Sequence, residues 1–261
     1  MEKIELNINE QGVAQLTLNR PEVSNALDAE LIQQFIDALT LVRKNSAIKV
    51  LLLNGNGKNF CAGADINWMR NMVHYSREEN ERDAQQLACL MRDLYEFPIP
   101  TIAIVQGAVY GGGIGLVACC DLAVADRETI FCLSEVKLGL IPAVISPYVI
   151  RAIGQRYAQR YFLTAEAFDA KQSLQLGLIH EIENFDVMVP HDIIKTVQTW
   201  VRHILHNGPN ALKKAKELIL NVSGNPLNEA LMNYTAKTIA DLRIQDEAQT
   251  RLHLFLEKNN V

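Results

Sequence analysis

Two short segments rich in glycine and alanine contain the residues best suited to chemistry. They are Asn59-Phe-Cys-Ala-Gly-Ala-Asp65 and Tyr110-Gly-Gly-Gly-Ile-Gly115. Each follows an apolar, strand-like run and precedes a helical pattern, and small residues there let a ligand approach backbone N–H groups closely. Two such loops, if they converge, could bind one oxygen that becomes negative during a reaction. The pair therefore predicts an enzyme of acyl-transfer or enolate chemistry.

Glu135 is a third candidate, because it lies in the otherwise apolar stretch Phe131-Cys-Leu-Ser-Glu-Val136. A poorly solvated carboxyl group has a raised pKa, which brings it toward a useful range for proton transfer. The alternative is a solvated glutamate at a strand edge, and the pattern alone leaves both interpretations open.

Other chemistries have weaker support. Gly113-x-Gly115-x-x-Ala118 follows a strand and matches a dinucleotide-binding fingerprint, with Asp126 at the end of the next strand. The helix between these strands would be too short for an ordinary parallel crossover, which takes about a dozen residues or more. The same loop lacks the Gly-Lys-Ser/Thr ending of a phosphate-binding loop.

Nucleophile and metal signals are also weak. His203 and His206 lie three positions apart but have no nearby Glu or Cys ligand set, so we expect no metal site. There is no Gly-x-Ser-x-Gly nucleophile motif. Cys61 lies beside the first loop without a convincing histidine partner, which favours a packed thiol.

The elements that must position these loops alternate between strand and helix. Ile4–Ile8 and Val13–Leu18 predict a hairpin, and residues 49–53, Thr101–Val105 and 122–125 predict further strands. Residues 66–95 predict a helical stretch whose polar middle, 74–83, could cover the site. This order favours an α/β core with substantial parallel pairing.

After about residue 186 the pattern is helical throughout, divided at Gly208-Pro209 and Gly224-Asn-Pro226. We therefore divide the chain into an α/β core that carries the candidate site at 1–185 and a C-terminal helical region at 186–261. The apolar faces of these helices need something to cover, and subunit packing is one candidate.

Composition narrows the function classes. The chain has 261 residues, is 49% hydrophobic and carries a net charge of −5, so it offers no basic footprint for nucleic acid. Five cysteines suggest no disulfide framework, and no apolar run is long enough to span a bilayer. Without a signal pattern at the N-terminus, we expect a cytoplasmic protein that contacts no membrane.

Taken together, the segments resemble the crotonase (enoyl-CoA hydratase/isomerase) superfamily. The shared features run in that superfamily's order and include Leu18-Asn-Arg-Pro21, Phe60-Cys-Ala-Gly-Ala-Asp65, Pro100-Thr-Ile-Ala-Ile-Val-Gln-Gly107, Tyr110-Gly-Gly-Gly113, Cys120-Asp121, and residues 131–139 with Ile141-Pro142. The resemblance implies repeated β-β-α units and C-terminal helices that reach a neighbour in a homotrimer or a dimer of trimers.

The resemblance also implies roles for single residues. The N–H groups of Ala64 and Gly112 would hold the thioester oxygen, and Glu135 would transfer the proton. Coenzyme A is part of the substrate, and neither a metal nor a further cofactor is expected. The positions that match the superfamily's CoA contacts are Val23, Asn25, Ala26, Ala62, Gly63, Asp65, Ile66, Phe255 and Lys258.

One departure leaves the reaction open. Typical hydratases carry two glutamates twenty positions apart, and here the first position is Gly115 while the second is Glu135. Glu135 alone suits an enoyl-CoA isomerase, whereas hydration needs another group or ordered solvent. If the empty position limits hydration, Gly115→Glu should raise crotonyl-CoA hydration. A non-catalytic acyl-CoA binder is a further alternative.

A narrower resemblance favours hydration. Residues 64–69 and 133–148 are similar to methylglutaconyl-CoA hydratase-type proteins, which act in leucine and acyclic-terpenoid breakdown. Their branched substrates carry a second carboxylate, which would need a cation or hydroxyl at the far end of the acyl chain. The candidates for this contact are Arg70, Lys137, Ser146 and Tyr148.

Overall fold

The computed structural model describes residues 2–184 and 194–258 and has a mixed α/β fold, as the sequence predicts. A six-stranded sheet forms its centre, in the order β1-β2-β3-β4-β6-β9. Only the β1–β2 pair is antiparallel, which confirms the predicted hairpin and the parallel core. The strands are β1 (Ile4–Ile8), β2 (Val13–Leu18), β3 (Val50–Gly55), β4 (Thr101–Val105), β6 (Leu122–Asp126) and β9 (Glu181–Glu183).

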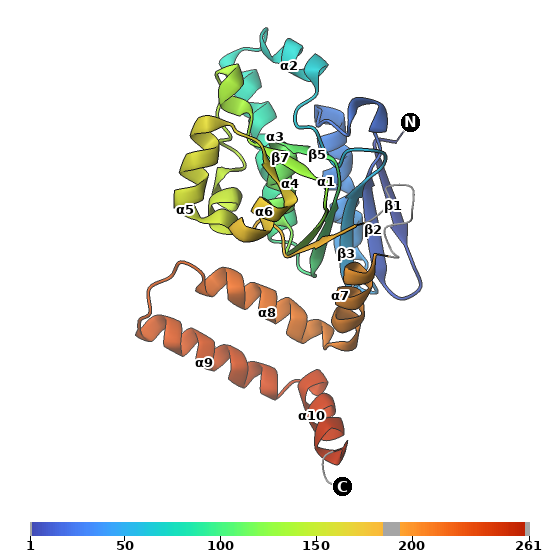
Figure 1. Ribbon diagram of the computed structural model, residues 1–261. Helices are drawn as coiled ribbons and strands as arrows, with labels where there is room; N and C mark the ends of the chain where they lie inside the picture. Colours follow the sequence, from blue (N-terminus) through green and yellow to red (C-terminus); the bar gives the residue numbers. More distant parts are fainter. Residues whose placement is uncertain (1, 185–193, 259–261) are drawn as a thin grey trace.

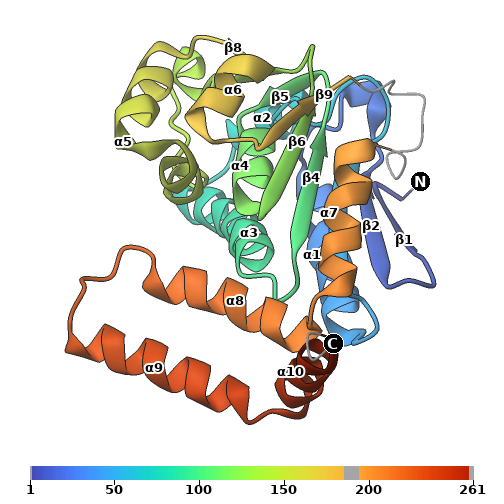
Figure 2. The ribbon, with the colours of Figure 1, turned by 60° about the horizontal axis from the view of Figure 1, so that its bottom comes forward.

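Helices cover both faces of this sheet, which explains why its central strands are continuous apolar runs. Leu51 and Leu53 of β3 point into the larger core cluster, with α1 (Ala29–Lys44), α3 (Arg77–Tyr95) and α4 (Gly112–Cys119). Val50 and Leu52 alternate with them and pack against α7 (Lys195–His206). Figure 2 shows α7 lying across the strands on the side away from α3 and α4.

A smaller sheet, in the order β5-β7-β8, lies beside the main one and supports the second glycine-rich loop. Two further helices and two short 3₁₀ helices, η1 and η2, complete the α/β core. These elements are β5 (Ala108–Tyr110), β7 (Ile130–Cys132), β8 (Phe168–Asp169), α5 (Ser146–Thr164), α6 (Ala170–Leu176), η1 (Pro21–Val23) and η2 (Glu135–Leu138).

The predicted helical stretch over 66–95 consists of two helices, which are separated within its polar middle. α2 (Ile66–Met72) ends before a short turn, and α3 begins after Ser76. The Ser76 hydroxyl accepts from the Glu79 N–H at 3.2 Å, while the Glu79 carboxylate accepts from the Ser76 N–H at 2.7 Å. This capping box starts a new helix within the polar segment.

The C-terminal helices extend away from the sheet (Figure 1). α8 (Pro209–Val222), α9 (Glu229–Arg243) and α10 (Asp246–Lys258) follow α7 in order. The proposed boundary at 185/186 lies outside the described residues, and α7 packs on the core rather than with the extended helices. Within the described ranges, no helix is long and apolar enough to cross a membrane.

Candidate active site

The two small-residue loops lie against each other, which meets the condition for a shared oxygen site. The Tyr110 N–H donates to the Cys61 carbonyl at 2.9 Å, and the Cys61 N–H donates to the Ala108 carbonyl at 3.2 Å. A Cβ on Gly113 would lie 2.6 Å from the Cys61 carbonyl oxygen, so only glycine permits this approach. The first loop is thus joined directly to the strand and turn that carry the second.

Each loop leaves one N–H group without a hydrogen-bond acceptor among the described residues. Leu27 forms a parallel β-bridge opposite Ala64, but its two hydrogen bonds are made with the residues on either side of Ala64. The Leu27 N–H donates to the Gly63 carbonyl at 2.7 Å, and the Asp65 N–H donates to the Leu27 carbonyl at 2.8 Å. The Ala64 N–H is therefore unused. Gly112 is the first residue of α4, where an N–H has no intrahelical partner.

A glycine with positive φ precedes each unused donor. Gly63 has φ +95° and Gly111 has φ +47°, a region that residues with a side chain seldom adopt. Leu27 then packs over the second donor, because a Cβ on Gly112 would lie 2.7 Å from Leu27 Cδ1. Backbone conformation and close packing together fix the direction of both N–H groups.

Glu135 begins η2 next to the second loop. A Cβ on Gly111 would lie 3.0 Å from its Oε1, and its Oε2 is buried with no hydrogen-bond partner in the part of the chain that the structure describes. Burial raises the pKa of this carboxyl above its ordinary 4.5, against a smaller lowering by its own backbone N–H. The carboxyl is therefore available for proton transfer rather than committed to a structural ion pair.

Both donors and Glu135 line one cavity of about 360 Å³. Its remaining wall is largely apolar and comes from α2, α3 and the segment after η2. The members other than the loops and Glu135 are Leu27, Trp68, Met69, Met72, Asn80, Asp83, Ala84, Leu87, Ser134, Leu138, Leu140, Ile141, Pro142, Ala143, Val144 and Ile145. A mostly apolar cavity with a few convergent polar groups is typical of a small-molecule site.

A second carboxyl group, which the sequence analysis missed, also lines this cavity. Trp68 Nε1–H donates to Asp83 Oδ1 at 3.0 Å. Burial raises the Asp83 pKa from its ordinary 3.8, and this effect outweighs the lowering by the Trp68 bond. Asp83 and Asn80 lie on the helix face that also carries the partly buried Leu87 and the buried Leu90 and Leu94. Polar residues on this inward face were the sequence signal for a second carboxyl group.

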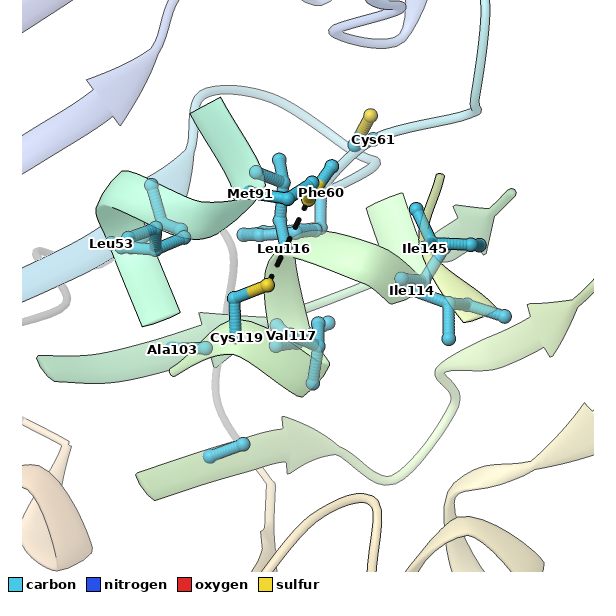
Figure 3. Packing of buried hydrophobic residues seen from close by; sticks show 14 of the residues in the cluster. Leu53, Phe60, Cys61, Met91, Ala103, Ile114, Leu116, Val117, Cys119 and Ile145 are labelled. Atoms are coloured by element: carbon cyan, nitrogen blue, oxygen red, sulfur yellow. Dashed lines mark hydrogen bonds between the residues drawn. The ribbon is translucent and has the colours of Figure 1, made fainter. Parts of the chain in front are cut away.

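The empty glutamate position is filled by other side chains. A Cβ on Gly115 would lie 2.3 Å from Ile145 Cγ2 and 3.2 Å from Met91 Cε. Figure 3 shows Met91 and Ile145 in the packed cluster around α4. A glutamate at position 115 would therefore have to displace Ile145, an obstacle that the sequence did not reveal.

Several predicted CoA contacts are fixed by structural bonds. The buried Asn25 amide donates to the carbonyls of Asn56 and Asn59 at 2.9 and 2.8 Å and accepts from the Arg20 N–H at 2.7 Å. Asp65 caps α2 and pairs with Arg20 at 3.0 Å. Burial pushes the Asp65 pKa up, but the N–H groups of Trp68 and Asn67 and the Arg20 guanidinium outweigh it, so the pKa is lowered. Both residues hold the first loop in shape.

The other predicted CoA residues are not all at the cavity. Ala62 and Gly63 line it. Val23 and Ile66 are exposed and Ala26 is buried, and none of these three is in the described lining. Phe255 and Lys258 lie on α10, at the far end of the molecule from α2 (Figure 1). The structure therefore does not bring these two residues to the cavity of their own chain.

None of the four candidate acyl-end contacts lines the cavity. Arg70 is exposed and donates to Asn67 at 3.1 Å, and Lys137 is also exposed. The Ser146 hydroxyl donates to the Ala143 carbonyl at 2.8 Å. The Tyr148 ring packs against the Tyr95 ring, with 5.0 Å between the ring centroids, and Tyr148 is absent from the described lining. Among the described residues, the lining includes no lysine, arginine or histidine.

The remaining candidates carry no site. Cys61 is buried, and burial raises its thiol pKa to about 12, so it is a packed thiol rather than a nucleophile. All five cysteines are free. A larger cavity of about 700 Å³ lies between the end of α3 and α8, but the glycine-rich loops and Glu135 are absent from its described lining.

The comparisons with known proteins agree with this geometry. A family model described as enoyl-CoA hydratase/isomerase matches residues 8–261. The chain belongs to this family. A crystal structure of an enoyl-CoA hydratase from Shewanella pealeana is 44% identical and superposes with a TM-score of 0.93, over 98% of this chain and 94% of that one.

Curated family members differ in their named reactions. A crotonyl-CoA hydratase from Syntrophomonas wolfei is 31% identical, over 79% of this chain and 77% of its own. An isomerase of trans-2-decenoyl acyl-carrier protein from Streptococcus mutans is 29% identical, over 80% and 79%. The chain is therefore an enzyme of the hydratase/isomerase family with an acyl thioester substrate, and the reaction depends on its own site residues.

Proposed function

We propose that this protein reversibly adds water across the double bond of a 2-enoyl-CoA thioester. The observation that carries the proposal is the cavity lined by Ala64 and Gly112, whose N–H groups are unused, and by Glu135, whose Oε2 has no hydrogen-bond partner among the described residues. Donors aimed at a developing oxyanion and a carboxyl with a raised pKa are what this addition needs.

In the proposed step, the Glu135 carboxylate takes a proton from water as the water oxygen bonds to C3. The electron pair of the C2=C3 bond moves to C2, and negative charge develops on the thioester oxygen. The N–H groups of Ala64 and Gly112 stabilise that charge. Glu135 then returns the proton to C2, so water is consumed and the enzyme regains its starting state.

A neutral, apolar acyl chain fits the cavity best. Its wall is built from side chains such as Met69, Met72 and Leu87, and the described lining offers no cation to pair with a second carboxylate. The branched methylglutaconyl-type substrate is the second candidate, supported by the resemblance of residues 64–69 and 133–148.

An isomerase is the second candidate function. Ile145 occupies the space at Gly115, so the usual pair of glutamates cannot form. A single Glu135 could move a proton between C2 and C4 of an enoyl chain without any water. Product identity separates this reaction from hydration.

Assembly is also a proposal. α10 exposes Leu252, Phe255 and Leu256, and Phe255 cannot reach its own cavity in this arrangement. We infer that a second copy covers these helices, in a homotrimer or a dimer of trimers, and that Phe255 and Lys258 contact CoA there. We expect the enzyme to act in the cytoplasm.

A panel of acyl-CoAs with products resolved by mass spectrometry tests the proposal. The panel contains crotonyl-CoA, a 3-enoyl-CoA and 3-methylglutaconyl-CoA. Formation of 3-hydroxybutyryl-CoA from crotonyl-CoA supports hydration of neutral chains. Conversion of the 3-enoyl-CoA alone, without a hydroxyacyl product, would replace the proposal with the isomerase. Binding of the panel without turnover of any member would leave only an acyl-CoA binder.

A further inference from the structure

The cavity contains a polar group that the proposed step does not use. Asp83 lies on α3, seven residues into the helix that Ser76 caps, and it lines the cavity together with Asn80, Ala84 and Leu87. These positions share one helical face. Farther along the same face, Met91 and Leu94 are fully buried in the core. Two polar residues, Asn80 and Asp83, therefore begin a face that is apolar from Ala84 onward.

The carboxyl group is held on one side only. Trp68 Nε1–H donates to Oδ1 at 3.0 Å, and Trp68 itself is buried. Asp83 makes no ion pair with another described residue, and its Oδ2 has no hydrogen-bond partner among them. A half-buried carboxylate that is neither paired nor fully bonded is costly for the fold, so its placement calls for a functional explanation.

Hydration poses a problem that this placement solves. The attacking water needs an acceptor for each of its two O–H groups if it is to be held in one orientation, and Glu135 supplies one acceptor. In typical hydratases a glutamate at the position of Gly115 supplies the second acceptor. Here Ile145 fills the space beside Gly115. Asp83 is the other carboxyl group of the described lining, and it reaches the cavity from α3 rather than from α4 or η2.

We propose that Asp83 is a second catalytic carboxylate, which accepts one O–H of the attacking water while Glu135 takes the other proton. This inference rests on the proposed hydratase function. The water oxygen bonds to C3, the electron pair of C2=C3 moves to C2, and Glu135 returns its proton to C2. The proton that faces Asp83 stays on oxygen as the new hydroxyl, so Asp83 ends the cycle unchanged.

Trp68 has a defined part in this arrangement. Its N–H occupies Oδ1, which leaves Oδ2 as the oxygen that can accept from the water. The bond also stabilises the ionised form, since burial alone would raise the pKa of the Asp83 carboxyl further. Trp68 is thus a positioning residue that keeps Asp83 an acceptor.

Asp83→Asn is the sharpest test. Asparagine has the same shape as aspartate. If its carbonyl oxygen accepts from Trp68, its NH₂ group faces the water and can only donate; in the opposite orientation, a neutral and therefore weaker acceptor faces the water. Asp93→Asn is the matched control, because it makes the same change on the same helix at a residue outside the described lining of the cavity. Thermal unfolding and binding of the saturated butyryl-CoA confirm that both variants are folded.

Two activities are then compared. Hydration of crotonyl-CoA needs the bound water, whereas exchange of the C2 protons of butyryl-CoA with D₂O needs only Glu135 and the two N–H donors. Asp83→Asn should lower the kcat of hydration by about 100-fold, the range expected when a reactant is no longer held in its reactive orientation. Its proton exchange should stay within threefold of the wild type, while Glu135→Gln loses both activities.

The outcomes separate cleanly. A fall in hydration of less than tenfold in Asp83→Asn overturns the role of Asp83 while the hydratase function stands. If proton exchange falls as much as hydration in Asp83→Asn, Asp83 only supports the structure of the site, and its proposed catalytic role is also overturned. Wild-type protein that exchanges protons but does not hydrate any enoyl-CoA defeats the proposed function itself.

A second pair of variants guards against misfolding. Asp83→Glu retains a carboxylate and should recover more hydration than Asp83→Asn does. Trp68→Phe keeps Asp83 but removes its donor, so the acid limb of the hydration pH profile should move to higher pH. An unshifted limb together with no recovery in Asp83→Glu contradicts the proposal.

Discussion

Ile145 occupies the space that any side chain at Gly115 would need, with its Cγ2 2.3 Å from the position of a Cβ there. Gly115 lies within α4, and Ile145 immediately precedes α5, so the contact joins two helices that pack on one another. The glycine is therefore part of a close helix contact, and the site is built around an isoleucine where typical hydratases keep a glutamate.

The first prediction concerns this pair. Gly115→Ala should lower the free energy of unfolding by about 1–3 kcal/mol through overpacking, although alanine is the better helix former. In an Ile145→Ala background the same change should cost less, because the nearest methyl group is gone, although the Cβ of residue 145 stays 2.9 Å from the new Cβ. Urea unfolding of the four proteins measures the coupling. Additive effects would show that the two residues do not compete for space.

Gly115→Glu gives a related outcome for activity. It should destabilise the protein and should not increase crotonyl-CoA hydration, since the carboxylate cannot enter the cavity without displacing Ile145. A stable Gly115→Glu variant with faster hydration would contradict this account of the site.

The second prediction concerns Glu135. Glu135→Gln should lower kcat by about 10²–10⁴-fold, the contribution of a positioned acid–base group. Affinity for a saturated acyl-CoA should change little, because the N–H donors remain. Steady-state kinetics and calorimetric binding measure the two effects. Near-normal turnover in this variant would remove Glu135 from the mechanism.

The third prediction is a pH dependence. Burial raises the pKa of Glu135 above its ordinary 4.5, and the base form is needed, so activity should fall as pH decreases through a value above 4.5. A raised pKa in the folded state also means that stability present below about pH 4.5 is lost as pH rises through the folded value. Glu135→Gln should therefore melt higher than the wild type at neutral pH, and the difference should shrink under acidic conditions. Identical melting temperatures at pH 7 would contradict the desolvation of this group.

The fourth prediction tests the second N–H donor. In Gly112→Ala the new Cβ would lie 2.7 Å from Leu27 Cδ1 and should displace the donor. Loss of one oxyanion donor typically lowers kcat by about 10²–10³-fold. Leu27→Ala in the same protein should restore part of the loss by opening space. If Gly112→Ala keeps full kcat, this N–H does not hold the oxyanion.

The fifth prediction concerns the exposed face of α10. Leu252 and Leu256, four residues apart, are both about half-exposed, at 48% and 55%. Leu252→Glu with Leu256→Glu should produce a smaller species in sedimentation velocity and should raise KM for acyl-CoA. Thr250→Glu, exposed on the same helix, serves as the control. A wild-type protein that sediments as a monomer would rule out the proposed assembly.

The sequence alone was enough to predict the framework of the site. Alternating apolar residues predicted the hairpin and the strands that precede each loop, because the side-chain period of a strand is read directly from residue types. The small residues at 62–64 and 111–113 predicted loops in which backbone N–H groups are accessible. Glu135 stood out because a carboxyl in an apolar run is unusual.

Tertiary structure alone decided how the site is completed. Asp83 belongs to a segment that the sequence presented only as a polar cover, and its place in the cavity depends on the Ser76 cap and on packing against Trp68. The space at Gly115 is closed by Ile145, thirty positions away in the sequence, and the direction of the Ala64 N–H depends on its bridge to Leu27. Local periodicity determines which element a residue joins, but which side chains meet in a cavity depends on contacts between distant segments.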